Sequence, residues 1–374
     1  MAQIKKIMTI KTIMTEKEYR TLPNEILSYS QLKTFDQSRH KYYKRYVLEE
    51  QDDDSNQSAL LGSIVDCLLT CPEEFDNRFH KMTGNAPTGQ WGEYINQLST
   101  TCRRFLKGGK FTIEFTDIMK IAFDEFKEVN PDKFKGKDFE YIVLNYSKED
   151  SRSKIVPRDY FQQCLDHIDK TPVDLAMITR AEKVRESLVE GKYTSKYFQL
   201  KSSRLNQTSA TTTDDIEVLS QFPYRFVYRG QEFKILIDRL EINHTTQTVT
   251  VYDIKCVWDS LGFDFTVFKD RYYLQASLYW TGVSMFIKEM LPGYTLNEDF
   301  FFIIADTTLN YKSCLYRFPQ ELIQLGLTGF TDKRGRKWSG VNEIMDDILF
   351  CRENNDYKDS LYLAEVNGVV TIEI

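Results

Sequence analysis

The chain has 374 residues and a formal net charge of −6, with 41% hydrophobic and 28% charged residues, values ordinary for a folded globular protein. Aromatic residues make up 14%, which argues against disorder over most of the chain. The sequence has neither an apolar run near the ~18 residues needed to span a bilayer nor a signal-peptide pattern, so we expect a cytoplasmic protein without membrane contact.

The N-terminal part of the chain predicts two helices. The first covers residues 28–50, where apolar side chains recur at helical spacing and Ser30 is the expected N-cap. Residues 51–58 have the composition of a loop. The second helix is predicted at residues 59–69 and ends before Pro72.

The middle of the chain changes from helical to β-rich. Residues 81–200 are predicted to be mainly helical, and residues 201–215 form a polar linker. Three β-rich runs at residues 224–228, 232–242 and 248–257 then predict a meander of antiparallel strands.

The C-terminal part adds a helix at about 270–290, strand-like runs at 299–307 and 313–319, two more helices and a terminal strand at 368–374. This order predicts a mixed α/β fold (α+β mixed) whose central sheet is assembled late in the sequence.

Three charged residues lie at the ends of the predicted strands. Asp238 ends the run KILID, and Asp253 and Lys255 are two residues apart in YDIKC. Because alternate side chains of a strand share a face, Asp253 and Lys255 can converge, with Asp238 beside them on the next strand. Hard oxygen ligands of this kind suit Mg²⁺. In isolation, such an Asp-x-Lys pattern is more often an ion pair on an exposed strand face.

The surrounding motifs resemble a known family. GxxxD at 62–66, ID at 237–238, DIK at 253–255 and QASLY at 275–279 occur in the order of the RecB-like nucleases of the PD-(D/E)XK superfamily. The stretch SYSQLKTF resembles the helix that opens these domains, and LLGSIVDCLLTCPEEF resembles the first motif of the RecE-type, lambda-exonuclease-like phage branch.

This resemblance covers roughly residues 26–80 and 220–374 and implies a restriction-endonuclease-like core, a central mixed sheet flanked by helices, with a largely helical insertion. The domains that it implies are the N-terminal helical part of the nuclease domain with the first motif (1–80), the insertion (81–200) and the nuclease core (201–374).

The resemblance also implies the chemistry of the site. Asp238 and Asp253 would hold Mg²⁺ or Mn²⁺, and Lys255 would be the catalytic amine. Asp66 occupies a position that is usually His in the family, and its carboxylate oxygens can replace that ligand, so we expect it to bind metal as well.

Further residues are expected to face substrate. Gln275 and Tyr279 are four residues apart on one helix face, and by resemblance they complete the catalytic set. Lys269 and Arg271 at the start of that helix favour a phosphate, and Ser30 in the opening helix is a third expected nucleic-acid contact.

We therefore expect a metal-dependent DNA nuclease that hydrolyses phosphodiester bonds. It lacks a GxxxxGK[ST] loop, so it would be an ATP-independent exonuclease, and its seven scattered cysteines predict no iron–sulfur cluster.

By resemblance its setting is phage or prophage recombination and repair in the host cytoplasm, with DNA and a single-strand annealing protein as partners and a homo-oligomeric ring as its assembly. Two alternatives stay open, namely a structure-specific or nicking endonuclease and a non-catalytic DNA-end-binding or assembly protein.

Basic residues gather at three places, and the simplest interpretation of each is a solvated face. They are Arg39, Lys41, Lys44 and Arg45; Arg103, Arg104, Lys107 and Lys110; and Lys333, Arg334, Arg336 and Lys337.

Overall fold

The computed structural model describes residues 14–50, 57–83, 87, 89–151, 153–199 and 216–369. The predicted linker at 201–215 and residues 370–374 of the predicted terminal strand lie outside these ranges. The chain divides into two compact units, which are described separately. The first unit comprises Met1–Asp52 and Val184–Ile374, and the second comprises Asp53–Lys183.

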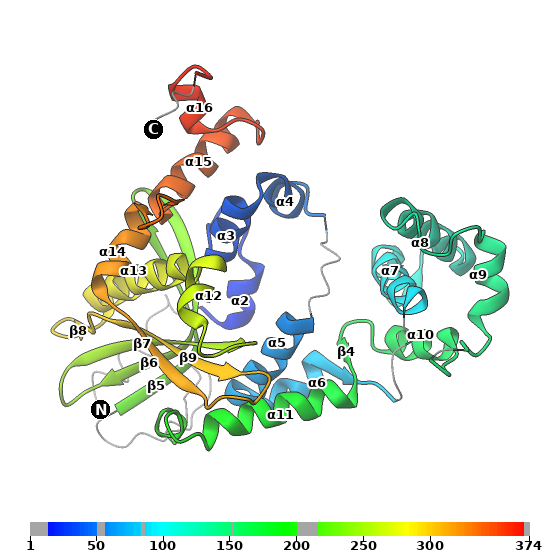
Figure 1. Ribbon diagram of the computed structural model, residues 1–374, viewed down its shortest axis with the longest axis horizontal. Coiled ribbons are helices and arrows are strands. Elements are labelled where there is room, and N and C mark those ends of the chain that lie inside the picture. The colour runs from blue at the N-terminus through cyan, green and yellow to red at the C-terminus, as the bar shows by residue number, and fades with distance from the viewer. Residues whose placement is uncertain are drawn as a thin grey trace. The chain divides into compact units, whose positions relative to one another are not determined.

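The described part of the first unit is built on a mixed sheet of six strands (Figure 1). Strands β5, β6 and β7 are antiparallel neighbours, β9 runs parallel to β7, and β10 is antiparallel to β9, with the short β8 beside β7. Their bounds are β5 Ile216–Tyr228, β6 Gln231–Asn243, β7 Thr248–Val257, β8 Thr295–Leu296, β9 Phe300–Asp306 and β10 Cys314–Phe318. The predicted antiparallel meander and mixed α/β class are confirmed, although β5 begins well before residue 224.

Strand β7 lies between β6 and β9, and neither neighbour is paired with it along its whole length. Its pairing with β6 runs from Asn243–Thr248 to Arg239–Tyr252 and ends there. From Tyr252 onward it is paired in parallel with β9, up to Val257 and Asp306. The two central strands therefore separate at the point where Asp238 and Asp253 stand.

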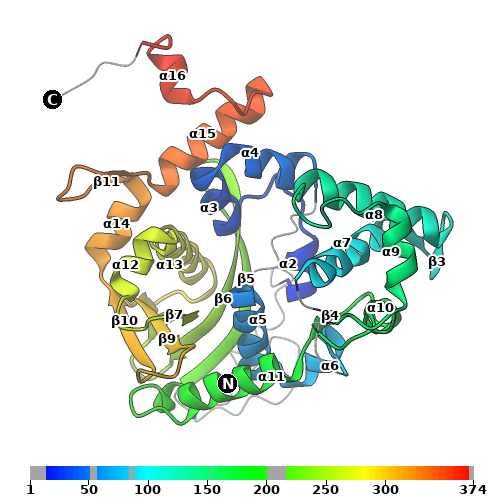
Figure 2. The same cartoon turned by 45° about the vertical axis from the view of Figure 1, so that its right-hand side comes forward.

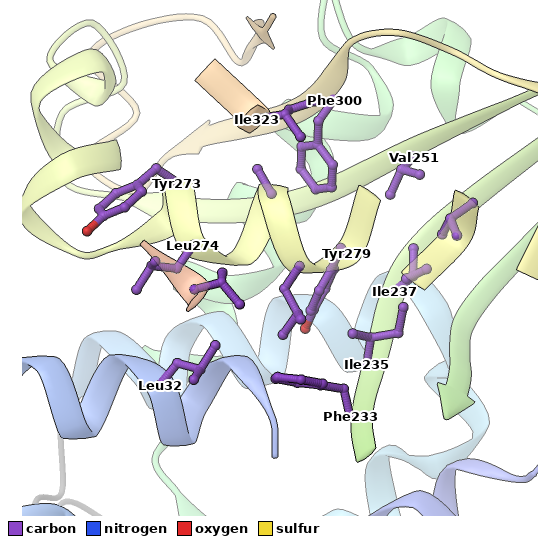
Figure 3. Close-up of a cluster of buried hydrophobic side chains, with 14 of the residues drawn as sticks. Leu32, Phe233, Ile235, Ile237, Val251, Tyr273, Leu274, Tyr279, Phe300 and Ile323 are labelled. Atoms are coloured by element: carbon purple, nitrogen blue, oxygen red, sulfur yellow. The ribbon is translucent and has the colours of Figure 1, made fainter. Parts of the chain in front are cut away.

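A long buried helix covers one face of this sheet. Helix α13 (Tyr272–Met290) packs on β5, β6 and β7, and Figure 3 shows its side chains meeting those of β6 and of α3 (Tyr29–Gln37). Figure 2 shows α12 (Phe263–Lys269) and α14 (Gln320–Thr328) beside it. Helices α15 (Val341–Asn354) and α16 (Leu361–Glu365) follow, and α2 (Glu16–Thr21) precedes α3. The helix predicted at 270–290 is confirmed.

The predicted single helix at 28–50 is wrong. The chain forms α3, then α4 (Arg39–Tyr42) and the π-helical turn η1 (Tyr43–Val47), because Ser38 leaves the helical conformation and caps α4. Ser30 is not the N-cap. Ser28 accepts the Gln31 N–H at 3.4 Å while Gln31 Oε1 accepts the Ser28 N–H at 2.9 Å. This S-x-x-Q capping box was visible in the sequence and was the better signal.

The second unit is mainly helical, as predicted, and has a core of its own. Its helices are α5 Gln57–Thr70, α6 Phe75–Arg78, α7 Gln90–Phe105, α8 Phe115–Val129, α9 Phe139–Tyr146, α10 Pro157–Asp166 and the first part of α11 Leu175–Val189. Aromatic side chains fill the core, among them Trp91, Tyr94, Phe123, Phe126 and Phe134. The short strands β1 (Phe79–Lys81) and β4 (Thr171–Val173) pair in parallel. Helix α5, which carries the first motif, belongs to this unit.

Candidate active site

The carboxylate of Asp238 accepts a backbone hydrogen bond at the point where β6 and β7 separate. Its Oδ2 accepts the N–H of Ile254 on β7 at 2.8 Å. The side chain thereby replaces the main-chain hydrogen bond that β6 would have supplied, since an unpaired buried N–H is costly. The same bond holds Asp238 beside Asp253.

Gln221 on β5 holds the other oxygen of Asp238. Its Nε2 donates to Asp238 Oδ1 at 3.3 Å, and its backbone has a left-handed φ of 49° inside the strand. A non-glycine residue in that region costs roughly 1–3 kcal/mol and persists only where its surroundings impose it. Sequence analysis missed Gln221, because no pattern marks a left-handed residue within an otherwise regular strand.

Asp253 is the most buried member of the group, with 1% of its surface exposed. It forms an ion pair with Lys255, which is 16% exposed, and its Oδ1 accepts Gln275 Nε2–H at 2.6 Å. The ion pair is therefore buried and does not lie on an exposed strand face, whereas its role beyond neutralising the two charges stays a prediction. The structure brings together Asp238, Asp253, Lys255 and Gln275, all from the first unit.

Burial and charge shift the pKa values of this group strongly. Burial raises the pKa of Asp253 to about 7, with the Lys255 ammonium opposing the rise and the neighbouring Asp238 adding to it. Burial also raises the pKa of Asp238, and the positive charge of Lys255 again opposes the rise. Burial lowers the pKa of Lys255, but the attraction of Asp253 outweighs it and the pKa is raised overall. Strongly shifted pKa values of neighbouring buried carboxylates occur often in functional sites, and this group is therefore a candidate for one.

Two lysines flank the ring of Tyr272 at the start of α13. Lys255 Nζ lies 4.8 Å from the ring centroid and Lys33 Nζ lies 5.4 Å from it. Burial lowers the pKa of Lys33, with Asp270 opposing the effect. Sequence analysis missed Lys33 and Tyr272, since α3 and α13 are more than two hundred residues apart in the chain and only the fold joins them.

Tyr279 is a core residue as well as a neighbour of the site. Figure 3 shows its side chain near Phe233 and Ile235 of β6. Burial raises the pKa of its hydroxyl well above the usual value, with Asp253 adding to the rise and a hydrogen bond with Gln275 opposing it. The phenol therefore stays neutral at physiological pH.

The expected nucleic-acid contacts occupy different environments. Ser30 and Lys269 are exposed. Arg271 is engaged within the protein by an ion pair with Asp36, and its guanidinium lies 5.2 Å from the ring centroid of Trp338.

Asp66 lies half-buried on α5 of the second unit. Its predicted role as a metal ligand stays a prediction.

The oxygen atoms present fit a hydrated divalent cation. Within the described ranges no three His, Cys, Asp or Glu side chains are grouped closely enough to hold a metal. Asp238 and Asp253 supply two carboxylates, and the buried Oε1 of Gln275 has no hydrogen-bond partner among the described residues. Mg²⁺ binds through one or two carboxylates and keeps several waters, so this donor set is sufficient for it.

Comparison of the sequence with protein-family models and with curated proteins found no match. Among the described helices, none combines the length and apolarity that crossing a membrane requires. The fold and the chemistry of the site therefore carry the functional argument.

Proposed function

We propose that the protein is a metal-dependent deoxyribonuclease of the PD-(D/E)XK type with a restriction-endonuclease-like core, acting as an ATP-independent exonuclease in phage or prophage recombination and repair. The proposal is based on one observation: the side chains of Asp238, Asp253, Lys255 and Gln275 lie together where β6 and β7 separate. Buried charges are costly unless they are paired or bind a metal, and here a single ammonium group, that of Lys255, faces two carboxylates.

Each side chain has a distinct role in the proposed reaction. Asp238 and Asp253 would hold Mg²⁺ or Mn²⁺, which supplies charge to the scissile phosphate and acidifies a bound water. Lys255 remains cationic and would stabilise the negative charge that develops on the phosphate in the transition state. Gln275 fixes the orientation of Asp253 through its 2.6 Å hydrogen bond.

Substitution of Lys255 tests the proposal. Lys255→Ala should reduce single-turnover cleavage of linear duplex DNA by roughly two to four orders of magnitude, because the lost charge acts mainly in the transition state. DNA affinity, measured by equilibrium titration, should stay nearly unchanged.

The matched control is Lys234→Ala, which removes another partly buried lysine of the same sheet whose Nζ donates to the Leu22 carbonyl at 3.0 Å. This variant should cleave at the parent rate. Cleavage by Lys255→Ala at the parent rate would show that the pair with Asp253 is only structural.

The choice of substrate separates the exonuclease from its alternatives. With Mg²⁺ and no ATP, the parent protein should degrade linear duplex to short products and leave covalently closed circles intact. Rapid cutting of the circles supports an endonuclease, and binding without cleavage of any DNA supports the non-catalytic alternative.

A further inference from the structure

A short hairpin in the first unit presents a cluster of positive charge. Strands β11 (Phe330–Thr331) and β12 (Lys337–Trp338) pair in antiparallel fashion and enclose the sequence DKRGR. We call residues 330–338 the basic hairpin; Figure 2 shows it at the end of α14. Its four basic side chains, Lys333, Arg334, Arg336 and Lys337, are all exposed.

Asp332 gives the turn a defined conformation. Its Oδ1 accepts the backbone N–H groups of Arg334 and Arg336, each at 2.9 Å, and its Oδ2 accepts Trp338 Nε1–H at 3.2 Å. Hydrogen bonding from the Arg336 backbone lowers the pKa of Asp332. Both carboxylate oxygens of the one acid in the hairpin are therefore used inside the turn, and the basic side chains form its outer surface.

Aromatic contacts attach the basic hairpin to the α12–α13 junction. The Trp338 ring lies 5.8 Å from Phe268 of α12 and 6.1 Å from Tyr273 of α13, between ring centroids. Phe330 contacts the same two rings. The hairpin is thus fixed to the first turn of the helix that carries Gln275, and exposed Lys269 adds a cation at this junction.

Part of this charge is not neutralised within the protein. Lys337 pairs with Glu343 at 3.2 Å, and Arg336 lies over the Trp338 ring, where its charge helps to lower the pKa of Asp332. Lys333 and Arg334 form no ion pair with any described carboxylate. Four exposed basic side chains on one hairpin of a chain with net charge −6 create a local positive potential that attracts polyanions.

We propose that the basic hairpin binds the phosphate backbone of the nucleic acid whose cleavage is proposed above, and so holds the substrate against the start of α13. The inference rests on that proposed function. The outward-facing side chains of DKRGR carry no apolar anchor for a membrane or a protein core contact, and their guanidinium and ammonium groups match the charge and hydrogen-bonding capacity of phosphate oxygens. A two-stranded ribbon also has dimensions that fit along a duplex groove.

Salt-dependent binding tests the inference. The triple variant Lys333→Gln, Arg334→Gln, Arg336→Gln should bind linear duplex DNA about 10- to 100-fold more weakly than the parent at roughly 0.1 M salt in EDTA. The slope of log K against log salt should shrink by about 0.9 for each phosphate contact that is lost.

The matched control removes the same number of exposed positive charges from the same unit. Lys288→Gln, Lys312→Gln, Lys358→Gln should leave both the affinity and the slope close to those of the parent. The melting temperature should be the same for both triple variants, because none of these side chains is buried.

The outcomes separate the two proposals. Cleavage by the parent combined with an unchanged salt slope in the hairpin variant would overturn the hairpin's role and leave the nuclease standing. DNA binding that depends on the hairpin, without cleavage by the parent, would support the hairpin and overturn the nuclease. Loss of binding to anionic vesicles but not to DNA would assign the hairpin to a membrane and overturn the inference.

Discussion

Asp238 and Asp253 are neighbouring aspartates in the candidate site, but their carboxylates have different hydrogen-bond and ion-pair partners. Asp238 accepts hydrogen bonds through both oxygens, from Ile254 N–H and from Gln221, and so maintains the backbone at the strand separation. Asp253 is held by Gln275 and Lys255. Each carboxylate raises the free energy of the other's ionised form, and a cation between them would remove that repulsion.

Metal should therefore stabilise the folded protein. We expect millimolar Mg²⁺ or Mn²⁺ to raise the melting temperature, because a ligand bound only by the native state adds to its stability. Asp253→Asn should remove most of this increase, which differential scanning calorimetry with and without EDTA would measure. Asp299→Asn, at an acid paired with Arg317 on the sheet edge, is the control and should retain the full metal response. An equal response in parent and Asp253→Asn would place the metal elsewhere.

Helix α13 connects the core of the first unit to the site. Its buried residues include Leu274 and Tyr279, whose side chains lie toward Leu32 of α3 and Phe233 of β6 (Figure 3). Gln275 on the same helix donates to Asp253 at 2.6 Å. Helix α14 approaches it closely at Gly326, where a Cβ would overlap Ser277 Oγ and lie 3.0 Å from the Tyr273 carbonyl oxygen. This crossing sets the position of α13 and hence of Gln275.

Substitution of Gly326 should disturb the helix crossing. Gly326→Ala should reduce the free energy of unfolding by about 1–3 kcal/mol, since overpacking a dense contact forces the helices apart. Ser277→Ala removes the overlapping hydroxyl, and combining it with Gly326→Ala should recover part of the loss. Urea denaturation of the four proteins of this double-mutant cycle measures the coupling. Simple addition of the two single effects would show that the close approach is not the cause.

At the scale of the whole molecule, each compact unit has its own hydrophobic core. Phe134 lies at the centre of the core of the second unit, 1% exposed, and its ring contacts those of Trp91, Tyr94 and Phe126. Phe302 is fully buried in the core of the first unit. We therefore expect a substitution at either residue to destabilise mainly the unit in which that residue lies.

Hydrogen exchange can detect this independence. Phe134→Ala should lower the opening free energy of amides in α7 and α8 by about 3–5 kcal/mol, the usual loss for a buried Phe. Amides of β6 and β7 should keep the protection that they have in the parent protein. Phe302→Ala should show the reverse pattern. Equal loss of protection in both units for either variant would contradict separate cores.

Much of the secondary structure could be predicted from local patterns in the sequence. The alternation in KILIDRL and TVTVYDIKCV predicted β6 and β7, and the spacing of Asp253 and Lys255 predicted their shared face, because both follow from the two-residue period of a strand. The position of α13 followed from its helical periodicity. The S-x-x-Q box at Ser28 is equally local, and the N-cap predicted at Ser30 is wrong because the side chain of Ser28 accepts the N–H of Gln31.

The meeting of segments that are distant in the chain could not be predicted from local patterns. The separation of β7 from β6, the left-handed Gln221 that supports Asp238, and the approach of Lys33 to Tyr272 depend on contacts between residues far apart in the chain. The attachment of the basic hairpin to α12 and α13 through Trp338 is of the same kind. Secondary structure and side-chain direction are governed by near neighbours, and for that reason the strands and the shared face of Asp253 and Lys255 could be predicted from local patterns. The burial that shifts the pKa values of the carboxylates and the packing that surrounds Gln275 arise only when the whole unit excludes water, so no local pattern could predict them.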